Sequence, residues 1–194
     1  MKFKMSKEKK IAVVCPCFNE SHTVIKFLDL IEKTYLQDTA LDIVVVNDAS
    51  TDNTLQLLKS YKFKSELFDL KILNLKYNQG HQKAIYNGLS YSYNNGYKKV
   101  IVMDSDGEDD PRAINELVDK SREFSVIHVG RKSRSENLKF KLLYFLYRFL
   151  FKLLTNKKMN FGNYSMIDRS VLFAVVNEGY IHYCLLYTSD AADD

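Results

Sequence analysis

The sequence is poor in the residues that mark interdomain linkers and disulfide frameworks. Its 194 residues include three cysteines, two prolines, seven glycines and no tryptophan. Cys15 and Cys17 are too close together for a usual zinc pair. The chain also lacks a stretch rich in Gly, Pro or Ser, a low-complexity tract and an internal repeat. These absences favour a single domain in a reduced, cytosolic setting.

No secretory signal is evident at the N-terminus. Residues 1–10 form a basic, lysine-rich extension that leads into only a short apolar run. Apolar residues make up 46% of the chain, which is typical of a folded globular protein and excludes a disordered one. The formal net charge of +4 is mild.

The last eleven residues, 184–194 (CLLYTSDAADD), have no turn or capping pattern and resemble a translated sequencing adaptor. We therefore expect the native chain to run past residue 183, with the gene cut there and the natural protein longer. The alternative is a frayed acidic C-terminus. Without the three aspartates of this tail, 28 basic residues face 21 acidic ones, a net charge of +7. Such an excess suits phosphate-bearing substrates or an anionic membrane surface.

Short apolar segments alternate with segments of helical periodicity. Pro16 is expected to end the first strand, and Pro111 to lie in the first turn of a helix. This alternation predicts an α/β domain with a mostly parallel sheet flanked by helices. The predicted strands are 11–15, 41–46, 70–75, 100–103 and 124–129; the predicted helices are 20–35, a helix capped by Ser50 or Asp52 and continuing to Tyr61, 82–93, and one after Pro111.

Polar residues follow each of the first four predicted strands. In sheets of this kind, ligands bind beyond the carboxyl ends of the strands. Each polar segment alone is typical of turns and helix caps, but four at one sheet edge favour a ligand site. The segments are 16–20, 47–52, 78–80 and 104–110.

Residues 104–110 carry five carboxylates in seven positions. These charges repel one another unless a cation lies among them. Asp104 and Asp106 are two residues apart, so both can face one point from the end of a strand. Oxygen ligands suit Mg²⁺ or Mn²⁺, and Mg²⁺ is usually held by one or two carboxylates plus substrate phosphates. An EF-hand is excluded because its later ligands are missing.

Four motifs in this order resemble glycosyltransferase family 2, whose members have the Rossmann-like GT-A fold. They read VCPCFNES, VVNDASTDNT, NQGHQKAIYNGL and VIVMDSDGEDDP, within a match over residues 11–176. The chain is most similar to the branch of dolichol-phosphate-mannose synthases and polyprenyl-phosphate glycosyltransferases, which FGNYSMIDRS also supports. We therefore expect residues 11–183 to form a family 2 catalytic domain with an incomplete C-terminus.

The resemblance implies a role for each residue of the nucleoside side. Pro16, Phe18 and Glu20 match the loop that packs against base and ribose. Asp48 matches the acidic residue that accepts hydrogen bonds from the nucleoside. His81, next to these motifs, is expected to be only a helix-start residue.

On the diphosphate side, Gly80 and Lys83 match the loop and helix near the phosphates, although Lys83 could equally lie on a solvated helix face. Asp104 and Asp106, with Ser105 between them, match the metal-binding DxD motif. Glu108 stands where this branch often has Gln, also near the metal. The expected cofactor is Mg²⁺ or Mn²⁺, and Asp106 is expected to act in catalysis.

Arg131 and Arg134 follow the fifth predicted strand and resemble the arginines that bind the acceptor phosphate in this branch; a solvated basic loop is the alternative. The resemblance implies metal-dependent transfer of a sugar, with inversion, from a nucleotide-sugar donor to a polyprenyl (dolichyl or undecaprenyl) phosphate. Two alternatives stay open: a saccharide acceptor, or a non-catalytic nucleotide-sugar-binding module. Members that glycosylate sugars usually carry Gln-x-x-Arg-Trp, and this sequence has no tryptophan. No nucleic acid partner is expected.

Residues 138–154 form an apolar segment with Lys141, Arg148 and Lys152 close to one helical face. The segment is too short and too charged to span a membrane comfortably. It predicts an interfacial helix on an anionic membrane, with a core helix as the alternative. The expected location is peripheral, at the cytoplasmic face of a membrane. Transmembrane helices often follow this domain in related proteins.

Overall fold

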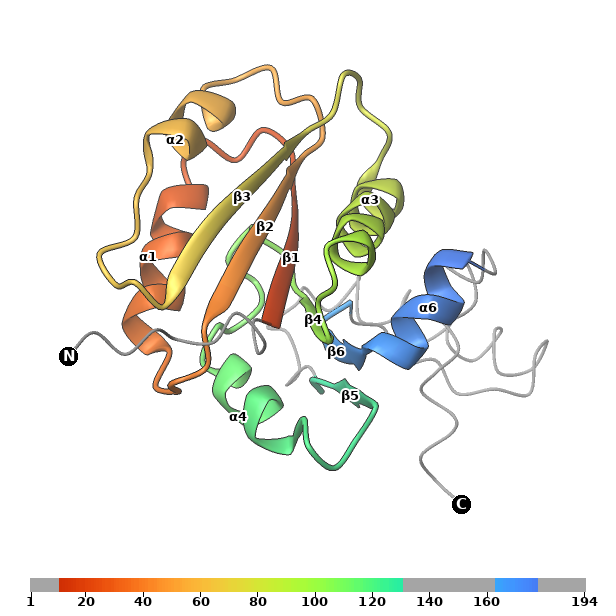
Figure 1. Ribbon diagram of the computed structural model, residues 1–194. Helices are drawn as coiled ribbons and strands as arrows, with labels where there is room; N and C mark the ends of the chain where they lie inside the picture. Colours follow the sequence, from red (N-terminus) through yellow and green to blue (C-terminus); the bar gives the residue numbers. More distant parts are fainter. Residues whose placement is uncertain (1–10, 131–162, 178–194) are drawn as a thin grey trace, which may run out of the picture.

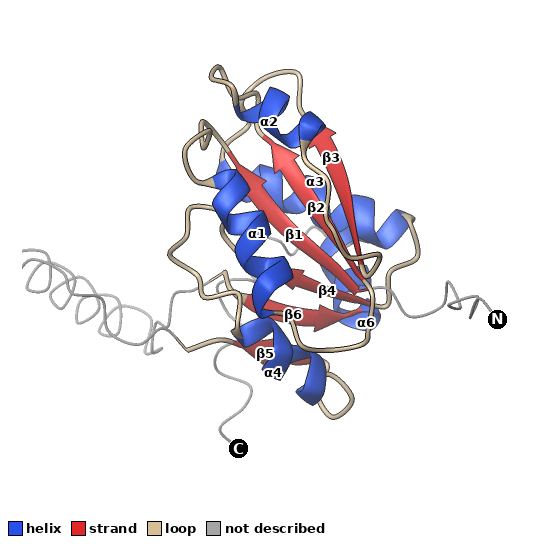
Figure 2. Cartoon of the chain, turned by 90° about the vertical axis from the view of Figure 1, so that its left-hand side faces the viewer, coloured by secondary structure: helices blue, strands red, loops and turns tan. Residues whose placement is uncertain are grey.

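The computed structural model describes residues 11–130 and 163–177, where a six-stranded sheet lies between two layers of helices (Figures 1 and 2). The sheet order is β3-β2-β1-β4-β6-β5. This arrangement confirms the predicted α/β class. The strands are β1 (Ile11–Cys17), β2 (Leu41–Asn47), β3 (Phe68–Asn74), β4 (Lys99–Val102), β5 (Val126–His128) and β6 (Ser165–Asp168); the helices are α1 (Val24–Thr34), α2 (Thr54–Ser60), α3 (His81–Asn94), α4 (Ala113–Lys120) and α6 (Arg169–Asn177).

Strand directions bring the loops that follow β1 to β5 to one edge of the sheet. β1 pairs in parallel with β2 and with β4, and β2 pairs in parallel with β3. β6 is antiparallel to both β4 and β5, which makes β5 parallel to β4. β6 therefore begins at the edge where the other five strands end. This is the edge at which an α/β sheet binds its ligands.

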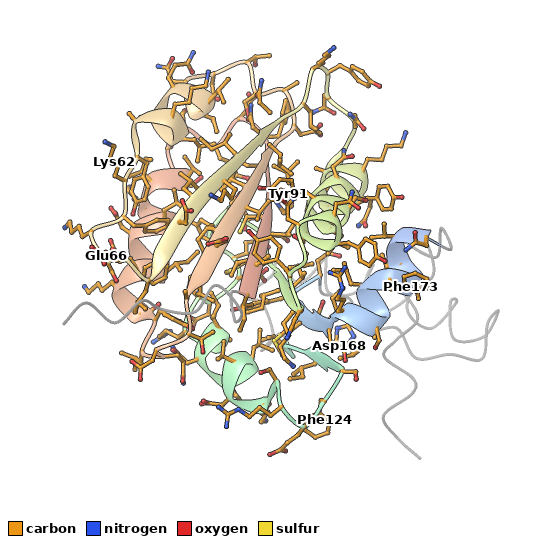
Figure 3. The ribbon with its side chains drawn as sticks, viewed as in Figure 1. Lys62, Glu66, Tyr91, Phe124, Asp168 and Phe173 are labelled. Atoms are coloured by element: carbon orange, nitrogen blue, oxygen red, sulfur yellow. The ribbon has the colours of Figure 1, made fainter. Side chains whose placement is uncertain are left out.

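The two faces of the sheet bury two separate apolar cores, because successive strand side chains point to opposite faces. Val13 and Cys15 of β1 pack in the core under α1, α2 and α4. Ala12 and Val14 pack in the core under α3 and α6. In Figure 1, α1 and α2 lie on one side of the sheet and α3 and α6 on the other. Tyr91 of α3 lies at the second core (Figure 3).

Pro16 does not end β1, contrary to the sequence prediction. The strand continues to Cys17, and Pro16 is paired with Val46 of β2. β4 pairs only with residues 12–14 of β1, so Pro16 lies where the strand has a neighbour on one side. A proline is tolerated there because its missing N–H leaves no ladder bond unmade.

The predicted helix over 20–35 begins later, at Val24. The backbone amides of Glu20 and Ser21 donate to Thr54 Oγ1 and Asp52 Oδ2, at 2.9 and 3.1 Å. These bonds tie the first loop to the second loop directly before the helix. Sequence periodicity extends over 20–35 but does not reveal this tertiary bond.

The sequence did not predict β6 or α6. β6 has only four residues, too few for a periodicity signal, and it is antiparallel in a mostly parallel sheet. The basic extension 1–10, the helix expected over 138–154 and the tail 184–194 lie outside the described residues. Among the helices of residues 11–130 and 163–177, none has the length and apolar character needed to cross a membrane.

Gly88 sets how closely α3 packs on the sheet. A Cβ added at this residue would lie 2.3 Å from Val14 Cγ1 and 3.1 Å from Val46 Cγ2. Both valines are fully buried and β-branched, so neither side chain can easily move aside. α3 lies close enough to β1 to carry His81 to the sheet edge only because residue 88 has no side chain.

We predict that Gly88→Ala lowers the free energy of unfolding by about 1–3 kcal/mol through overpacking. This loss outweighs the higher helix propensity of alanine, which at an exposed position stabilises a helix by roughly 1 kcal/mol relative to glycine. Chemical denaturation monitored by circular dichroism measures the change. Gln82→Ala, at an exposed position of the same helix, is the control and should be nearly neutral. An increase in stability for Gly88→Ala would contradict the close packing.

Candidate functional site

A cavity of about 370 Å³ opens at the carboxyl edge of the sheet. Its volume lies within the range of small-molecule sites. Five residues that the sequence predicted to bind a nucleotide sugar lie in its wall, brought together from three loops. The wall consists of Pro16, Cys17, Phe18, Glu20, Asp48, Asn78, Gly80, His81 and Ala84.

Asp48 joins three loops at the floor of this cavity and is only 3% exposed. Its backbone amide donates to Cys17 O at 2.9 Å. Its Oδ1 accepts from the amide of Gln79 at 2.7 Å, and its Oδ2 accepts from the amide of Gly80 at 2.8 Å. Gly80 has φ +87°, a left-handed conformation that favours glycine. The Asp48 carboxylate thus shapes the loop over 78–80, and each oxygen keeps one further lone pair for a ligand.

The first and second loops are bound to each other. The Asn19 amide donates to Ser50 Oγ at 2.9 Å, so Ser50 does not cap α2. The N-cap of α2 is Asn53, whose side chain makes no capping hydrogen bond, so the prediction of a cap at Ser50 or Asp52 is wrong. Asp52 Oδ1 instead accepts from the Thr54 amide at 3.0 Å. Burial raises the pKa of the Asp52 carboxyl, but hydrogen bonds from Thr54 and Ser21 have the larger combined effect and lower this pKa to about 2.

Glu20 points toward the acidic segment after β4. Burial raises the pKa of its carboxyl to about 7; the neighbouring Ser105 side chain opposes this shift, and the charges of Asp106 and Asp104 add to it. Its Oε2 is buried and finds no hydrogen-bond partner among the described residues. Glu20 therefore places a desolvated carboxyl in the cavity wall, near Asp104 and Asp106.

The residues 104–110, named here the acidic loop, are organised by their own carboxylates. Asp109, 4% exposed, accepts from the Asp104 amide at 2.9 Å through Oδ2. Asp106 Oδ1 accepts from the Glu108 amide at 2.8 Å. Asp110 forms an ion pair with Arg112, with 2.7 Å between Oδ2 and Nη2. Within the acidic loop, Asp109 thus binds a backbone amide and Asp110 binds Arg112.

The acidic loop does not form a closed metal site from protein groups alone. In residues 11–130 and 163–177, no group of three or more His, Cys, Asp and Glu side chains is close enough to hold a metal ion. Asp104 is partly buried at the end of β4, whereas Asp106 and Glu108 are exposed. Any ion here would need oxygen ligands from a substrate, as is usual for Mg²⁺.

Ser105 and Lys83 differ in how they relate to the cavity. Ser105 is 1% exposed, and its hydroxyl donates to Pro16 O at 2.7 Å, which fastens the acidic loop to the first loop. Lys83 is exposed in the first turn of α3 and lies outside the cavity wall. Its ammonium is therefore accessible from solvent at the start of α3.

His81 is a site residue whose importance the sequence did not show. It is the first residue of α3, as expected, but its ring also lines the cavity. Its Nε2 lies 3.5 Å from Asp104 Oδ1 and 2.8 Å from Asn163 Nδ2. These partners are far away in the sequence, so no local motif could have revealed the cluster.

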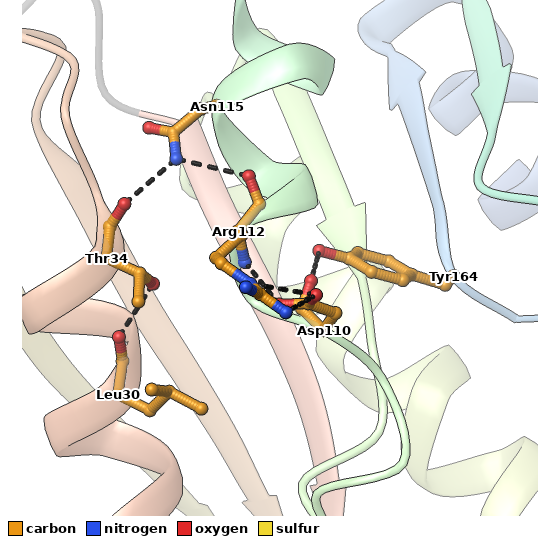
Figure 4. Close-up of polar contacts among 6 residues, drawn as sticks. All are labelled: Leu30, Thr34, Asp110, Arg112, Asn115 and Tyr164. Carbon is orange, nitrogen blue, oxygen red and sulfur yellow. Dashed lines mark hydrogen bonds and ion pairs between the residues drawn. The ribbon is translucent and has the colours of Figure 1, made fainter.

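A chain of polar contacts links the acidic loop to α1 and to the residue before β6 (Figure 4). The Tyr164 hydroxyl donates to Asp110 O at 3.0 Å. Arg112, paired with Asp110, offers its carbonyl to Asn115 Nδ2 at 3.1 Å, and the same Nδ2 donates to Thr34 O at 2.9 Å. The acidic loop is thereby connected to the end of α1 on one side and to the start of β6 on the other.

The proposed acceptor arginines, Arg131 and Arg134, lie outside the described residues. The last described residue before them is Gly130, two residues after the end of β5. β5 ends at the same sheet edge as β1 and β4, as the sequence predicted.

Comparisons with known proteins agree with this arrangement. A family model described as Glycosyl transferase family 2 matches residues 12–180. An uncharacterized glycosyltransferase of Synechocystis sp. is 32% identical over 174 residues, covering 86% of this chain and 52% of that protein. The undecaprenyl-phosphate 4-deoxy-4-formamido-L-arabinose transferase of Salmonella paratyphi B is 28% identical over 167 residues, covering 84% of this chain and 48% of that protein. The chain thus spans about half the length of these curated relatives.

Among solved structures, a mannosyltransferase from Pyrobaculum calidifontis in complex with GDP-Man and Mn²⁺ is similar, with a TM-score of 0.60 at 20% identity. The match covers 87% of this chain and 47% of that one. At this identity the likeness concerns the fold, and it confirms the expected GT-A architecture.

The burial of Glu20 predicts a pH-dependent stability in the absence of divalent ions. A carboxyl whose pKa rises on folding, here from 4.5 to about 7, stabilises the fold fully below pH 4.5, and this contribution is lost as the pH rises through 7. Glu20→Gln should therefore be more stable than the parent at pH 8, by roughly 1 kcal/mol after solvent screening. Denaturation at pH 4.5 and pH 8 measures the difference.

Glu66→Gln, at the exposed position labelled in Figure 3, is the control for the loss of a carboxylate. Equal stability of Glu20→Gln and the parent at both pH values would show that the Glu20 carboxyl is well solvated.

Proposed function

Because this chain belongs to glycosyl transferase family 2, we propose that it transfers a sugar from a nucleotide-sugar donor to a polyprenyl phosphate at the cytoplasmic face of a membrane. One observation carries the proposal: a single cavity, lined by Pro16, Phe18 and Asp48, opens beside the acidic loop at the carboxyl edge of the sheet. The nucleoside and the diphosphate of one donor can occupy these two adjacent places.

The cavity wall would bind the nucleoside. Phe18 is 44% exposed at the wall, so its ring offers an aromatic face to a base. The remaining lone pairs of Asp48 would accept hydrogen bonds from the nucleoside. Gly80 and Lys83 would lie toward the diphosphate, where the exposed ammonium of Lys83 contributes positive charge.

The residues present fit a divalent ion. Asp104 and Asp106 offer carboxylate oxygens beside the buried carboxyl of Glu20, and hard oxygen ligands suit Mg²⁺ or Mn²⁺. Asp104 and Asp106 would hold the ion, with Glu108 nearby and substrate oxygens completing its ligands. When bound, the ion supplies Lewis-acid stabilisation of the departing nucleoside diphosphate. Asp109 and Ser105 hold the loop that presents these carboxylates.

The acceptor phosphate would be bound by Arg131 and Arg134. A phosphate is already ionised, so it needs little help from a general base and attacks the anomeric carbon directly, with inversion. Charge-assisted hydrogen bonds to each arginine are worth roughly 1.5–3 kcal/mol. The similarity to an undecaprenyl-phosphate transferase supports this class of acceptor. Residues 138–154 would bring the domain to anionic lipid through Lys141, Arg148 and Lys152.

We predict that Asp104→Ala and Asp106→Ala abolish the Mn²⁺-dependent part of nucleotide binding, because each removes a carboxylate ligand. Isothermal titration calorimetry of UDP and GDP, with and without Mn²⁺, measures the Mn²⁺-dependent part of the nucleotide affinity. Asp38→Ala, an exposed carboxylate after α1 at the opposite edge of the sheet, is the matched control. Unchanged Mn²⁺-dependent affinity in Asp104→Ala and Asp106→Ala would disprove the metal assignment.

The acceptor class is tested with a panel of labelled UDP- and GDP-sugars offered together with polyprenyl phosphate or with oligosaccharides. We expect labelled lipid phosphate as the product, and a loss of about tenfold or more on replacing either Arg131 or Arg134 by alanine. Label in the oligosaccharide would identify a glycan acceptor instead. Donor binding without transfer to either acceptor, in a longer chain as well, would indicate a nucleotide-sugar-binding module.

A further inference from the structure

Two neighbouring residues directly before β6 contact two different parts of the site, the cavity wall and the acidic loop. Asn163 Nδ2 lies 2.8 Å from Nε2 of His81, which belongs to the cavity wall. The Tyr164 hydroxyl donates to Asp110 O at 3.0 Å, at the end of the acidic loop. The Asn163–Tyr164 pair is therefore in contact with a residue of the cavity wall and with the end of the acidic loop.

The strand register explains why this pair reaches both parts of the site. Ser165, the first residue of β6, is paired with Val102, the last residue of β4. Because β6 is antiparallel, the residues before Ser165 run beside the residues that follow β4, which are those of the acidic loop. The carbonyl of Tyr164 also accepts from the amide of Val129 at 2.9 Å, which fixes the pair against the end of β5.

The side chain of Tyr164 is well suited to keep the acidic loop at a fixed distance from β6. It is 2% exposed and among the largest fully buried side chains of the described part of the chain, so its ring has little freedom. Burial, with the nearby charges of Asp109 and Asp110, raises the pKa of its phenol. The hydroxyl therefore stays a neutral donor and keeps its bond to Asp110 O.

The cavity wall and the acidic loop approach each other closely. His81 Nε2 and Asp104 Oδ1 are 3.5 Å apart, although His81 begins α3 and Asp104 follows β4. An ion that binds Asp104 and the phosphates of a nucleotide in the cavity is sensitive to this separation, because Mg²⁺ demands near-ideal octahedral geometry with its ligands at about 2.0–2.1 Å.

We propose that Asn163 and Tyr164 are positioning residues that hold the cavity wall and the acidic loop at one separation, so that nucleoside diphosphate and divalent ion bind cooperatively. This role rests on the proposed function. Asn163 acts through His81, and Tyr164 acts through Asp110.

The test uses the 194-residue chain and its variants Tyr164→Phe and Asn163→Ala. Calorimetry gives the Kd of UDP and of GDP with and without Mn²⁺, and the ratio of the two Kd values measures the coupling between ion and nucleotide. We expect each variant to reduce this ratio about three- to tenfold, the effect of one net hydrogen bond, while the Kd without Mn²⁺ stays unchanged.

Tyr35→Phe is the matched control, because the Tyr35 hydroxyl also donates to a backbone carbonyl, Thr39 O at 2.7 Å, and Tyr35 belongs neither to the cavity wall nor to the acidic loop. Its thermal midpoint should fall as that of Tyr164→Phe does, with the ratio preserved. A ratio that is unchanged in Tyr164→Phe and Asn163→Ala, or that falls equally in Tyr35→Phe, would overturn the positioning role. If the parent chain shows no Mn²⁺-dependent tightening of UDP or GDP, the proposed function itself fails.

Discussion

The hydrogen bonds of Asp48 are the constraint on which the rest of the site depends. Its carboxylate accepts the amides of Gln79 and Gly80, and its own amide donates to Cys17 O. Three loops from three parallel strands are joined at this one buried residue. Since a buried carboxylate is costly unless it is hydrogen-bonded, the loop over 78–80 is stabilised in the shape that satisfies it. The cavity wall, including the start of α3, follows from that shape.

The acidic loop differs from the loop over 78–80 because five carboxylates are crowded into seven residues. Asp109 accepts a backbone amide and Asp110 binds Arg112, so two carboxylates organise the loop. Asp104 and Asp106 remain at the edge of the cavity beside Glu20, whose pKa burial raises. Placing three carboxyl groups together costs free energy in the absence of a cation. That cost is consistent with a loop built to bind a divalent ion together with phosphate.

Sequence periodicity predicted most of the fold, because each strand of the parallel sheet carries its own local signal. Four of the predicted loops lie at one edge, and the predicted residues Pro16, Phe18, Glu20, Asp48 and Gly80 line one cavity. The errors have a common physical cause. Pro16 stays in β1 because β4 stops short of it, and the residues before α1 are bound to the second loop through the amides of Glu20 and Ser21. Both depend on neighbours that are distant in the sequence.

The sequence by itself determined the strand-helix alternation, the shared edge and the placement of carboxylates after β4, since these follow from local patterns and from strand direction. Only the tertiary structure decided which carboxylates bind other groups of the protein, as Asp109 and Asp110 do. It also decided that His81 and Asn163, 82 residues apart, meet beside Asp104. The reason is physical: a side chain's hydrogen-bond partner is chosen by packing and strand register, and neither is encoded in the residues adjacent to it.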